Sequence, residues 1–406
     1  MLERQFGETT ALHAELELIA ALTHQEQFEE ARDRVEAALA SNPVAYQAEF
    51  YLNASGIYAG LGEFEKSITA SRRAIELRPN YVEAHWNLAA ILLLVGRLAE
   101  GLREFEWRGV DSALNPPRQY RQPQWRGETP DQAGGPLLIT SEEWLGDFIQ
   151  FARYCLPLAA QGHDVLLEVR PELYSLFRDG FHHERVRVIP RIPSLNRIEG
   201  DLPFSCYASI ISVPARLPSG LDALTEYVPY ITAPPERLPV WRKRIGEKLR
   251  NLKVGLVWAG NPGHIRDAER SIPPEKLRPL MERDDVDFYA IRKGSWDMSA
   301  FPPGSIVDLG EDIGDFADTA AIVDGLDLVI SVDTAVVHMA GAMGHPVWVM
   351  VTKMPDWRWQ LEGETTPWYP AVRLFRQQTR GDWDGVIAAV AAALDAFIAV
   401  SLRNNS

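Results

Sequence analysis

The sequence predicts an α-helical repeat domain followed by two parallel α/β domains. Up to about residue 110, pairs of amphipathic helical patterns recur with a period of roughly 34 to 36 residues. From residue 136 onward, short β-branched apolar runs alternate with helical patterns, as in βαβ units. The chain has 406 residues, of which 46% are hydrophobic and 24% are charged. These values predict a globular protein of two or three domains.

The helical repeats occupy a predicted domain of residues 1–110. Phe28 and Ala38 align with Phe64 and Ala74, and a third unit begins near Trp86. Each unit has small residues where its two helices cross and a short turn between them. The period and these positions resemble the tetratricopeptide repeat (TPR), with three degenerate units between residues 12 and 107. An ordinary helical bundle is the alternative.

The amino-acid composition of the chain changes at residues 111–135. They are rich in Pro, Gly, Arg and Gln and show no sustained periodicity. This composition predicts a linker.

Two arrays of alternating strands and helices follow, over residues 136–250 and 251–406. They predict two Rossmann-like domains that face each other across a cleft, with ligands at the carboxyl ends of the strands. In the first array we expect strands at 137–140, 164–169, 186–189 and 227–231, and helices at 147–160, 171–178 and 235–250. In the second we expect strands at 253–258, 286–291, 306–309, 328–332, 347–351 and 372–375, and helices at 274–282, 317–326, 335–343 and 384–402.

The most informative segment is the strand, helix and strand from Leu328 to Val351. Asp333 and Thr334 fall where the first strand ends and the helix begins. Unpaired backbone N–H groups and the positive end of the helix dipole favour an anion there. His338 follows Thr334 by one helical turn and shares its face. The segment therefore predicts a phosphate or nucleotide seat; the alternative is a helix cap beside a surface histidine.

In the first α/β domain, Asp147 follows the loosened turn after strand 137–140 and lies near the start of a helix. A carboxylate in this position can act as general base toward an acceptor hydroxyl or amide. A simple N-cap aspartate is the alternative interpretation. Glu142 and Glu143 are further acidic candidates, although adjacent charges in a loop are usually solvated.

Two further segments of the second domain lie at predicted strand ends. After strand 253–258, Asn261 is followed by Arg266 and Arg270, whose guanidinium groups can bind a diphosphate. After strand 347–351 come Lys353, Trp357 and Arg358. The aromatic residues here suit stacking on a base or sugar, but tryptophan-rich loops also simply cover the edge of a domain.

Several classes of function find no support in the sequence. The net charge of −15 argues against general nucleic-acid binding. Only Cys155 and Cys206 are present, and the histidines are scattered, so we expect neither disulfides nor a metal centre. GxxxxGK[ST], HExxH and GxSxG motifs are absent. No apolar run is long enough for an integral membrane segment, and we expect a cytoplasmic protein.

Four long stretches carry a family resemblance: LGDFIQFARYCLPLAAQGHDVLLEVRPEL, VGLVWAGNPGHIRDAERSIP, DLGEDIGDFADTAAIVDGLDLVISVDTAVVHMAGAMGHPVWVM and PDWRWQLEGETTPWYPAVRLFRQ. With them the last three quarters of the chain resemble the heptosyltransferase-type glycosyltransferases (family 9), in the bacterial branch that carries amino-terminal TPRs. The repeats together with this domain also resemble, in architecture, the protein O-linked sugar transferases of family 41.

The resemblance implies a GT-B fold and metal-independent, inverting transfer from a nucleotide sugar, without a cofactor. It implies that Asp147 is the general base and that the carboxyl-terminal domain holds the donor. There, Asp333, Thr334 and His338 correspond to the residues that hold the diphosphate, with Arg266 or Arg270 beside them.

The resemblance also implies a protein acceptor recruited by the repeats, with Tyr51, Tyr58, Trp86 and Asn87 as candidate contacts. By analogy with repeat-bearing relatives, a flagellin or another surface protein is the expected acceptor. One departure from the family pattern is Trp144, which replaces a glycine two residues before Gly146. It favours the alternative of a non-catalytic scaffold that binds a nucleotide sugar. A lipopolysaccharide-core transferase is a third interpretation, but it assigns no function to the repeats.

Overall fold

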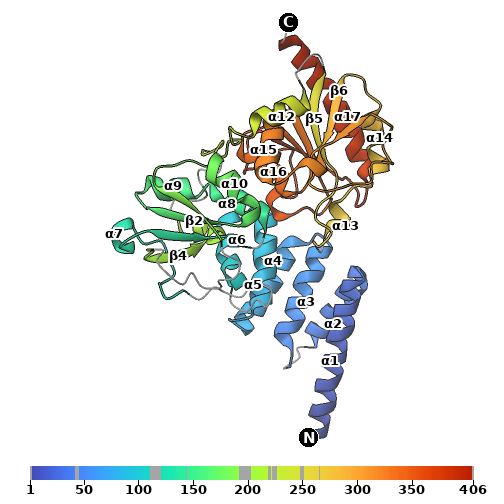
Figure 1. Cartoon of the computed structure of the whole chain (residues 1–406). Coiled ribbons are helices and arrows are strands. Elements are labelled where there is room, and N and C mark those ends of the chain that lie inside the picture. The colour runs from blue at the N-terminus through green and yellow to red at the C-terminus, as the bar shows by residue number, and fades with distance from the viewer. Residues whose placement is uncertain are drawn as a thin grey trace. The chain divides into compact units, whose positions relative to one another are not determined.

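The structure is a computed structural model of the chain (Figure 1). It describes residues 2–41, 45–109, 120–142, 144–191, 203–217, 221, 226–246, 251–264 and 266–404. Within the predicted linker, residues 111–119 lie outside the described residues, as do Glu143 and residues 247–250 of an expected helix. The chain forms two compact units, Met1–Pro117 with Asp356–Gln360 and Arg118–Pro355 with Leu361–Ser406. In the described part of the chain, no helix has the length and apolarity to cross a membrane.

The first unit consists of helices that pair in sequence order, as the repeat pattern predicts. A core of aliphatic and aromatic side chains, among them Ile19, Val35 and Phe50, joins the first two pairs. The hydroxyls of Ser55, Ser67 and Ser71 satisfy one another where the helices of the second pair cross, with Ser55 Oγ lying 3.1 Å and 2.6 Å from the other two. The elements are α1 (Leu2–His24), α2 (Phe28–Ala40), α3 (Gln47–Gly60), α4 (Phe64–Leu77), α5 (Val82–Leu94), α6 (Leu98–Phe105) and the 3-10 turn η1 (Glu106–Gly109).

The second unit contains two parallel sheets. The first sheet has four strands in the order β3-β2-β1-β4. Its strands are β1 (Leu137–Thr140), β2 (Val165–Val169), β3 (Val186–Pro190) and β4 (Cys206–Ser209). Its helical segments are α7 (Pro130–Ala133), α8 (Leu145–Ala152), α9 (Cys155–Ala160), α10 (Pro171–Gly180), η2 (Ile210–Ser212) and α11 (Val213–Arg216), and α12 (Leu238–Ile245) leads to the second sheet.

The second sheet has six strands in the order β10-β9-β8-β5-β6-β7. Three of its four inner strands, β5, β8 and β9, are fully buried, as expected for parallel strands covered on both faces. Its strands are β5 (Leu252–Val257), β6 (Val286–Ala290), β7 (Ile306–Asp308), β8 (Leu328–Val332), β9 (Val347–Val351) and β10 (Val372–Arg376). Its helices are α13 (Asp267–Arg270), α14 (Arg278–Met281), α15 (Phe316–Asp324), α16 (Ala335–Ala342) and α17 (Trp383–Asn404), with 3-10 turns η3 (Pro274–Leu277) and η4 (Gly310–Asp312). A further 3-10 turn, η5 (Trp357–Trp359), groups with the helical unit.

Two sequence predictions about these elements were wrong. The single helix expected over residues 147–160 is two helices, because Pro157 has no N–H and its ring excludes a continuous helix through Arg153. Residues 227–231 form no strand. Their N–H groups bond to helix carbonyls instead, Tyr230 N to Ala342 O at 2.9 Å and Thr232 N to Gly180 O at 2.9 Å. This segment therefore links the carboxyl ends of α16 and α10.

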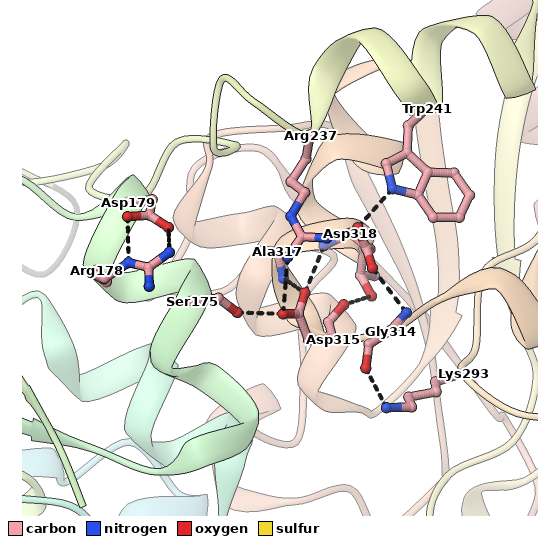
Figure 2. Close-up of polar contacts among 11 residues, drawn as sticks. Ser175, Arg178, Asp179, Arg237, Trp241, Lys293, Gly314, Asp315, Ala317 and Asp318 are labelled. Atoms are coloured by element: carbon pink, nitrogen blue, oxygen red, sulfur yellow. Dashed lines mark hydrogen bonds and ion pairs between the residues drawn. The ribbon is translucent and has the colours of Figure 1, made fainter.

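Polar contacts fasten α15 to α10 of the first sheet and to α12 (Figure 2). Asp315 caps α15 by accepting hydrogen bonds from two of its backbone N–H groups, and it also accepts one from Ser175 of α10. Asp318 accepts from the indole N–H of Trp241 at 2.9 Å and pairs with Arg237 at 3.1 Å. The bond from Ser175 therefore links a helix of the first sheet to one of the second, and the bonds of Asp318 link α12 to α15.

Candidate functional site

The second sheet changes winding direction between β5 and β8. From β5 the chain proceeds outward through β6 and β7, and from β8 it proceeds the other way through β9 and β10. Such a switch point opens a crevice at the carboxyl ends of the two strands, where ligands of α/β proteins bind. Val257 pairs with Ser331, so both strands end at the same level. The predicted segments that contain Asn261 and Asp333 therefore leave the sheet side by side.

The amino terminus of α16 has no side-chain cap. Thr334 occupies the N-cap position, but its side chain accepts no hydrogen bond from the helix. Its Oγ1 lies instead 3.2 Å from Oγ of Ser331. The backbone N–H groups of the first turn therefore keep their capacity to bind an anion. Asp333 contributes its backbone carbonyl, which accepts a hydrogen bond of 2.9 Å from Arg270 Nη1.

His338 is a buried residue, with 4% of its surface exposed, which excludes the surface-histidine alternative. Its Nδ1 lies 3.1 Å from the hydroxyl of Tyr369. Burial raises the pKa of Tyr369 well above its ordinary value, so this hydroxyl stays protonated. Tyr369 orients the imidazole through Nδ1, so that Nε2 is the ring nitrogen turned toward α8.

The first sheet has a switch point of its own, between β1 and β4. Thr140 pairs with Ser209, so these strands too end at one level. Ser209 donates a hydrogen bond to the carboxylate of Glu142 directly after β1. The sequence prediction missed β4, a short strand in a proline-rich region, and with it this second switch point.

Asp147 is the third residue of α8 and is half-buried. The N-cap position of this helix belongs to Trp144, so the N-cap interpretation of Asp147 was wrong. A carboxylate in the first turn of a helix is stabilised by the helix dipole, which favours its ionised form. The ionised form is the one that a general base requires.

At Gly146, the helix that follows β1 approaches the helix that follows β8. Helices α8 and α16 pack against each other, and a Cβ on Gly146 would lie 2.9 Å from His338 Cδ2 and 3.4 Å from Nε2. It would also lie 3.8 Å from the backbone of Ala335. Only glycine allows this approach of α8 to the uncapped end of α16, and Asp147 is the next residue of α8.

Replacing Gly146 with alanine should displace His338, because the imidazole is held from behind by Tyr369. We expect nucleotide binding or transfer to fall by about tenfold or more, since small misplacements in a site have large kinetic effects. Isothermal titration with nucleotide sugars would measure it. Gly56→Ala is the matched control, because nothing lies within 4 Å of a Cβ at this helical position. Equal behaviour of the two variants would show that the contact with His338 has no functional role.

Arg266 and Arg270 both lie near the switch point, and both are already paired with carboxylates. Arg266 bonds to Glu269 at 3.0 Å and to the carbonyl of Met354 at 2.6 Å. Arg270 bonds to Asp267 at 3.1 Å. Gly260 accommodates that pair, since a Cβ there would collide with both partners. The two arginines therefore line the site and are held in place by their carboxylate partners.

The remaining predicted donor residues divide between the two units. Asn261 is exposed and forms a local turn, with its Oδ1 accepting from Gly263 N at 3.0 Å. Lys353 is exposed at the carboxyl end of β9. Trp357 and Arg358, by contrast, belong to the segment that groups with the helical unit, where η5 packs on α5. The structure therefore does not assign them to the second sheet.

The candidate acceptor contacts lie on α3 and α5 of the helical unit. Trp86 is 48% exposed, whereas Tyr51, Tyr58 and Asn87 are half-buried. The Tyr58 hydroxyl donates to Glu36 at 2.9 Å, and burial together with this bond raises the pKa of Tyr58 to about 12. Trp86 therefore offers the largest free apolar surface of the four.

Two arginines that sequence reasoning missed lie in the second unit. Arg292 comes two residues after β6, and its guanidinium lies 3.4 Å from the ring centre of Trp296. Its place directly after a predicted strand was the available signal. Arg153 is 1% exposed and bonds to the carbonyl of Trp368 at 2.6 Å. No local pattern marks Arg153, because its partners are far away in the sequence.

Trp144, which replaces the glycine of the family pattern, is 54% exposed. Its ring meets the imidazole of His264 edge to face, with 5.3 Å between the ring centres. His264 belongs to the segment after β5, so this contact links the segments that follow both switch points. The tryptophan therefore lines the site from the side of the first sheet.

Comparison with known proteins identifies a repeat in the helical unit. Residues 57–96 match the model of the TPR repeat. Over 94% of its length the chain is 27% identical to Protein FlbA of Caulobacter vibrioides, of which the match covers 72%. The repeat match confirms the tetratricopeptide prediction for this part of the helical unit.

The solved structures to which the chain is similar include glycosyltransferases. E. coli ADP-heptose lps heptosyltransferase II is 10% identical, with 67% of this chain and 100% of that chain covered and a TM-score of 0.45. The glycosyl transferase family 9 structure from Veillonella parvula is 11% identical, with 65% and 97% covered and a TM-score of 0.45. An O-GlcNAc transferase of Thermobaculum terrenum is 13% identical, with 97% and 94% covered and a TM-score of 0.29.

Proposed function

We propose that the chain is an inverting, metal-independent glycosyltransferase that moves a sugar from a nucleotide sugar to an acceptor. The observation that carries this proposal is the contact of Gly146 with His338. Asp147, which follows Gly146 in α8, supplies a half-buried carboxylate on one side of this contact, and the uncapped amino terminus of α16 lies on the other. A base and an anion seat in one site are what displacement of a nucleotide diphosphate requires.

The proposed reaction is a single displacement. The acceptor oxygen or nitrogen forms a bond to the anomeric carbon while the bond from that carbon to the phosphate oxygen breaks. Asp147 takes the acceptor proton, and the electron pair of the broken bond leaves with the diphosphate. Backbone N–H groups of α16, the Thr334 hydroxyl and His338 Nε2 stabilise the charge that develops there. Attack opposite to the leaving group inverts the anomeric configuration.

The proposed acceptor is a protein, for which a flagellin is one candidate. The repeat match at residues 57–96 supports this part, because such repeats form protein-binding surfaces. Trp86 supports it as well, since exposed tryptophans are enriched among binding hot spots. Trp86→Ala should therefore impair modification of a protein acceptor while leaving binding of the donor unchanged.

A non-catalytic scaffold that binds a nucleotide sugar is the second candidate. The contact of Trp144 with His264 favours it, because an indole that spans from one segment to the other occupies space next to Asp147. Trp144→Gly should raise the transfer rate if the indole blocks the acceptor and lower it if the indole positions the acceptor.

The deciding experiment screens nucleotide sugars by thermal shift and then measures transfer of labelled sugar to a bacterial protein extract. We expect one nucleotide sugar to stabilise the chain and to support transfer that persists in a metal chelator. Nuclear magnetic resonance of the product should show an inverted anomeric centre. Binding without transfer would favour the scaffold. If no nucleotide sugar binds, both candidates fail.

A further inference from the structure

Arg292 differs from Arg266 and Arg270 in that it forms no ion pair with a carboxylate of the described residues. Its guanidinium is stacked on Trp296, at 3.4 Å from the ring centre. Within the described part of the chain, its buried Nη1 has no hydrogen-bond acceptor, and the same holds for the indole N–H of Trp296. A guanidinium with unmet donors is an anion-binding group, because buried donors without acceptors are costly.

The charges around Arg292 leave it uncompensated. Arg266 pairs with Glu269, which also pairs with Arg380, and Arg270 pairs with Asp267. Burial lowers the pKa of Arg292, and Arg270 lowers it further, while Asp267 raises it. A single carboxylate, that of Asp267, therefore serves two guanidinium groups. One positive charge remains for a ligand.

The position of Arg292 also fits a ligand contact. Leu256 of β5 pairs with Ala290 of β6, so Arg292 leaves the sheet level with Trp258. The rings of Trp258 and Trp296 meet edge to face, at 6.0 Å between centres. Trp296 in turn packs on the core of the second sheet. The platform under the guanidinium is therefore anchored at the carboxyl ends of β5 and β6, next to the crevice between β5 and β8.

We propose that Arg292, held flat on Trp296, supplies the uncompensated positive charge that binds a phosphoryl group of the donor. This inference rests on the proposed function and names a residue that the sequence did not indicate. It also separates two roles. Arg266 and Arg270 shape the wall of the site through their carboxylate partners, whereas Arg292 meets the ligand. Stacking restricts the side chain before binding, so little rotamer entropy is lost when the phosphate arrives.

The test compares Arg292→Met with Lys293→Met by isothermal titration of the full chain. Lys293 is the matched control because it is the next residue, carries the same charge and bonds to the carbonyl of Gly314. The probes are inorganic pyrophosphate, the diphosphates ADP, GDP and UDP, and the corresponding nucleosides. We expect Arg292→Met to weaken binding of the phosphate-containing probes by about 10- to 100-fold. Nucleoside binding and the control variant should match wild type.

The outcomes separate the two proposals. If wild type binds none of the diphosphates, the proposed function fails together with this inference. If wild type binds one and Arg292→Met binds it equally well, only the role of Arg292 is overturned. Weaker nucleoside binding in a folded Arg292→Met would also overturn it, because the residue would then act on the base. Should the methionine variant unfold, Arg292→Gln decides, because it removes the charge but keeps a polar side chain: pyrophosphate affinity equal to wild type would overturn the role of Arg292.

Discussion

Replacing Asp147 with asparagine should lower the rate of sugar transfer by about 10²- to 10⁴-fold. The amide has nearly the same shape as the carboxylate, but it cannot accept the proton of the acceptor. Binding of the nucleotide sugar should persist, because the groups proposed to bind its diphosphate are Thr334, His338, Arg292 and the first turn of α16, and Asp147 is not among them. Single-turnover transfer assays and titration of the donor would measure the two effects separately.

The control is Asp384→Asn, which removes a carboxylate from the first turn of another helix, α17. Both variants lose a favourable interaction with a helix dipole, worth about 0.3–1 kcal/mol. Only Asp147→Asn should lose transfer. If both variants transfer at the wild-type rate, Asp147 only stabilises the helix through its dipole, and another group must accept the proton.

The strand and helix that carry the anion seat could be predicted from the sequence because their signals are local. The run Leu328–Val332 ends where predicted, and Thr334 begins the next helix. The switch points could not be predicted, since they depend on strand order. The position of β8 beside β5 is a long-range pairing that no local pattern records.

The carboxylate partners of the arginines could not be predicted from the sequence either. Arg266 and Arg270 looked like ligand contacts, but each has a carboxylate partner that the fold presents to it. Arg292 was overlooked because a single arginine after a strand is an ordinary surface feature. The structure adds that its guanidinium is stacked on Trp296 and that its buried Nη1 has no hydrogen-bond acceptor among the described residues. The aromatic segment after β9 shows the reverse case, since Trp357 and Arg358 group with the helices.

Arg153 lies at the centre of the contacts between the two sheets of the second unit. It follows α8, and its Nη1 bonds to the carbonyl of Trp368, which precedes the residue that holds His338. Its guanidinium also lies 4.6 Å from the ring centre of Tyr369 and 5.1 Å from that of Tyr230. The Tyr230 hydroxyl in turn donates to the carbonyl of Ile149 in α8, at 2.8 Å. A single buried cation therefore couples the helix of the proposed base to the tyrosine that orients His338.

Arg153→Ala should accordingly reduce the free energy of unfolding by about 3 kcal/mol or more, because it removes several buried contacts and leaves carbonyl groups without donors. Arg153→Lys should recover part of this loss, since it keeps the charge but not the planar fork. Chemical denaturation would measure both, with Arg283→Ala as the control: that arginine pairs with the exposed carboxylates of Asp285 and Asp395, and such pairs contribute about 0–1 kcal/mol. Because Arg153 acts through Tyr369, the lysine variant should also bind the donor more weakly while it remains folded. A lysine variant with wild-type donor affinity would show that Arg153 stabilises the fold without positioning His338.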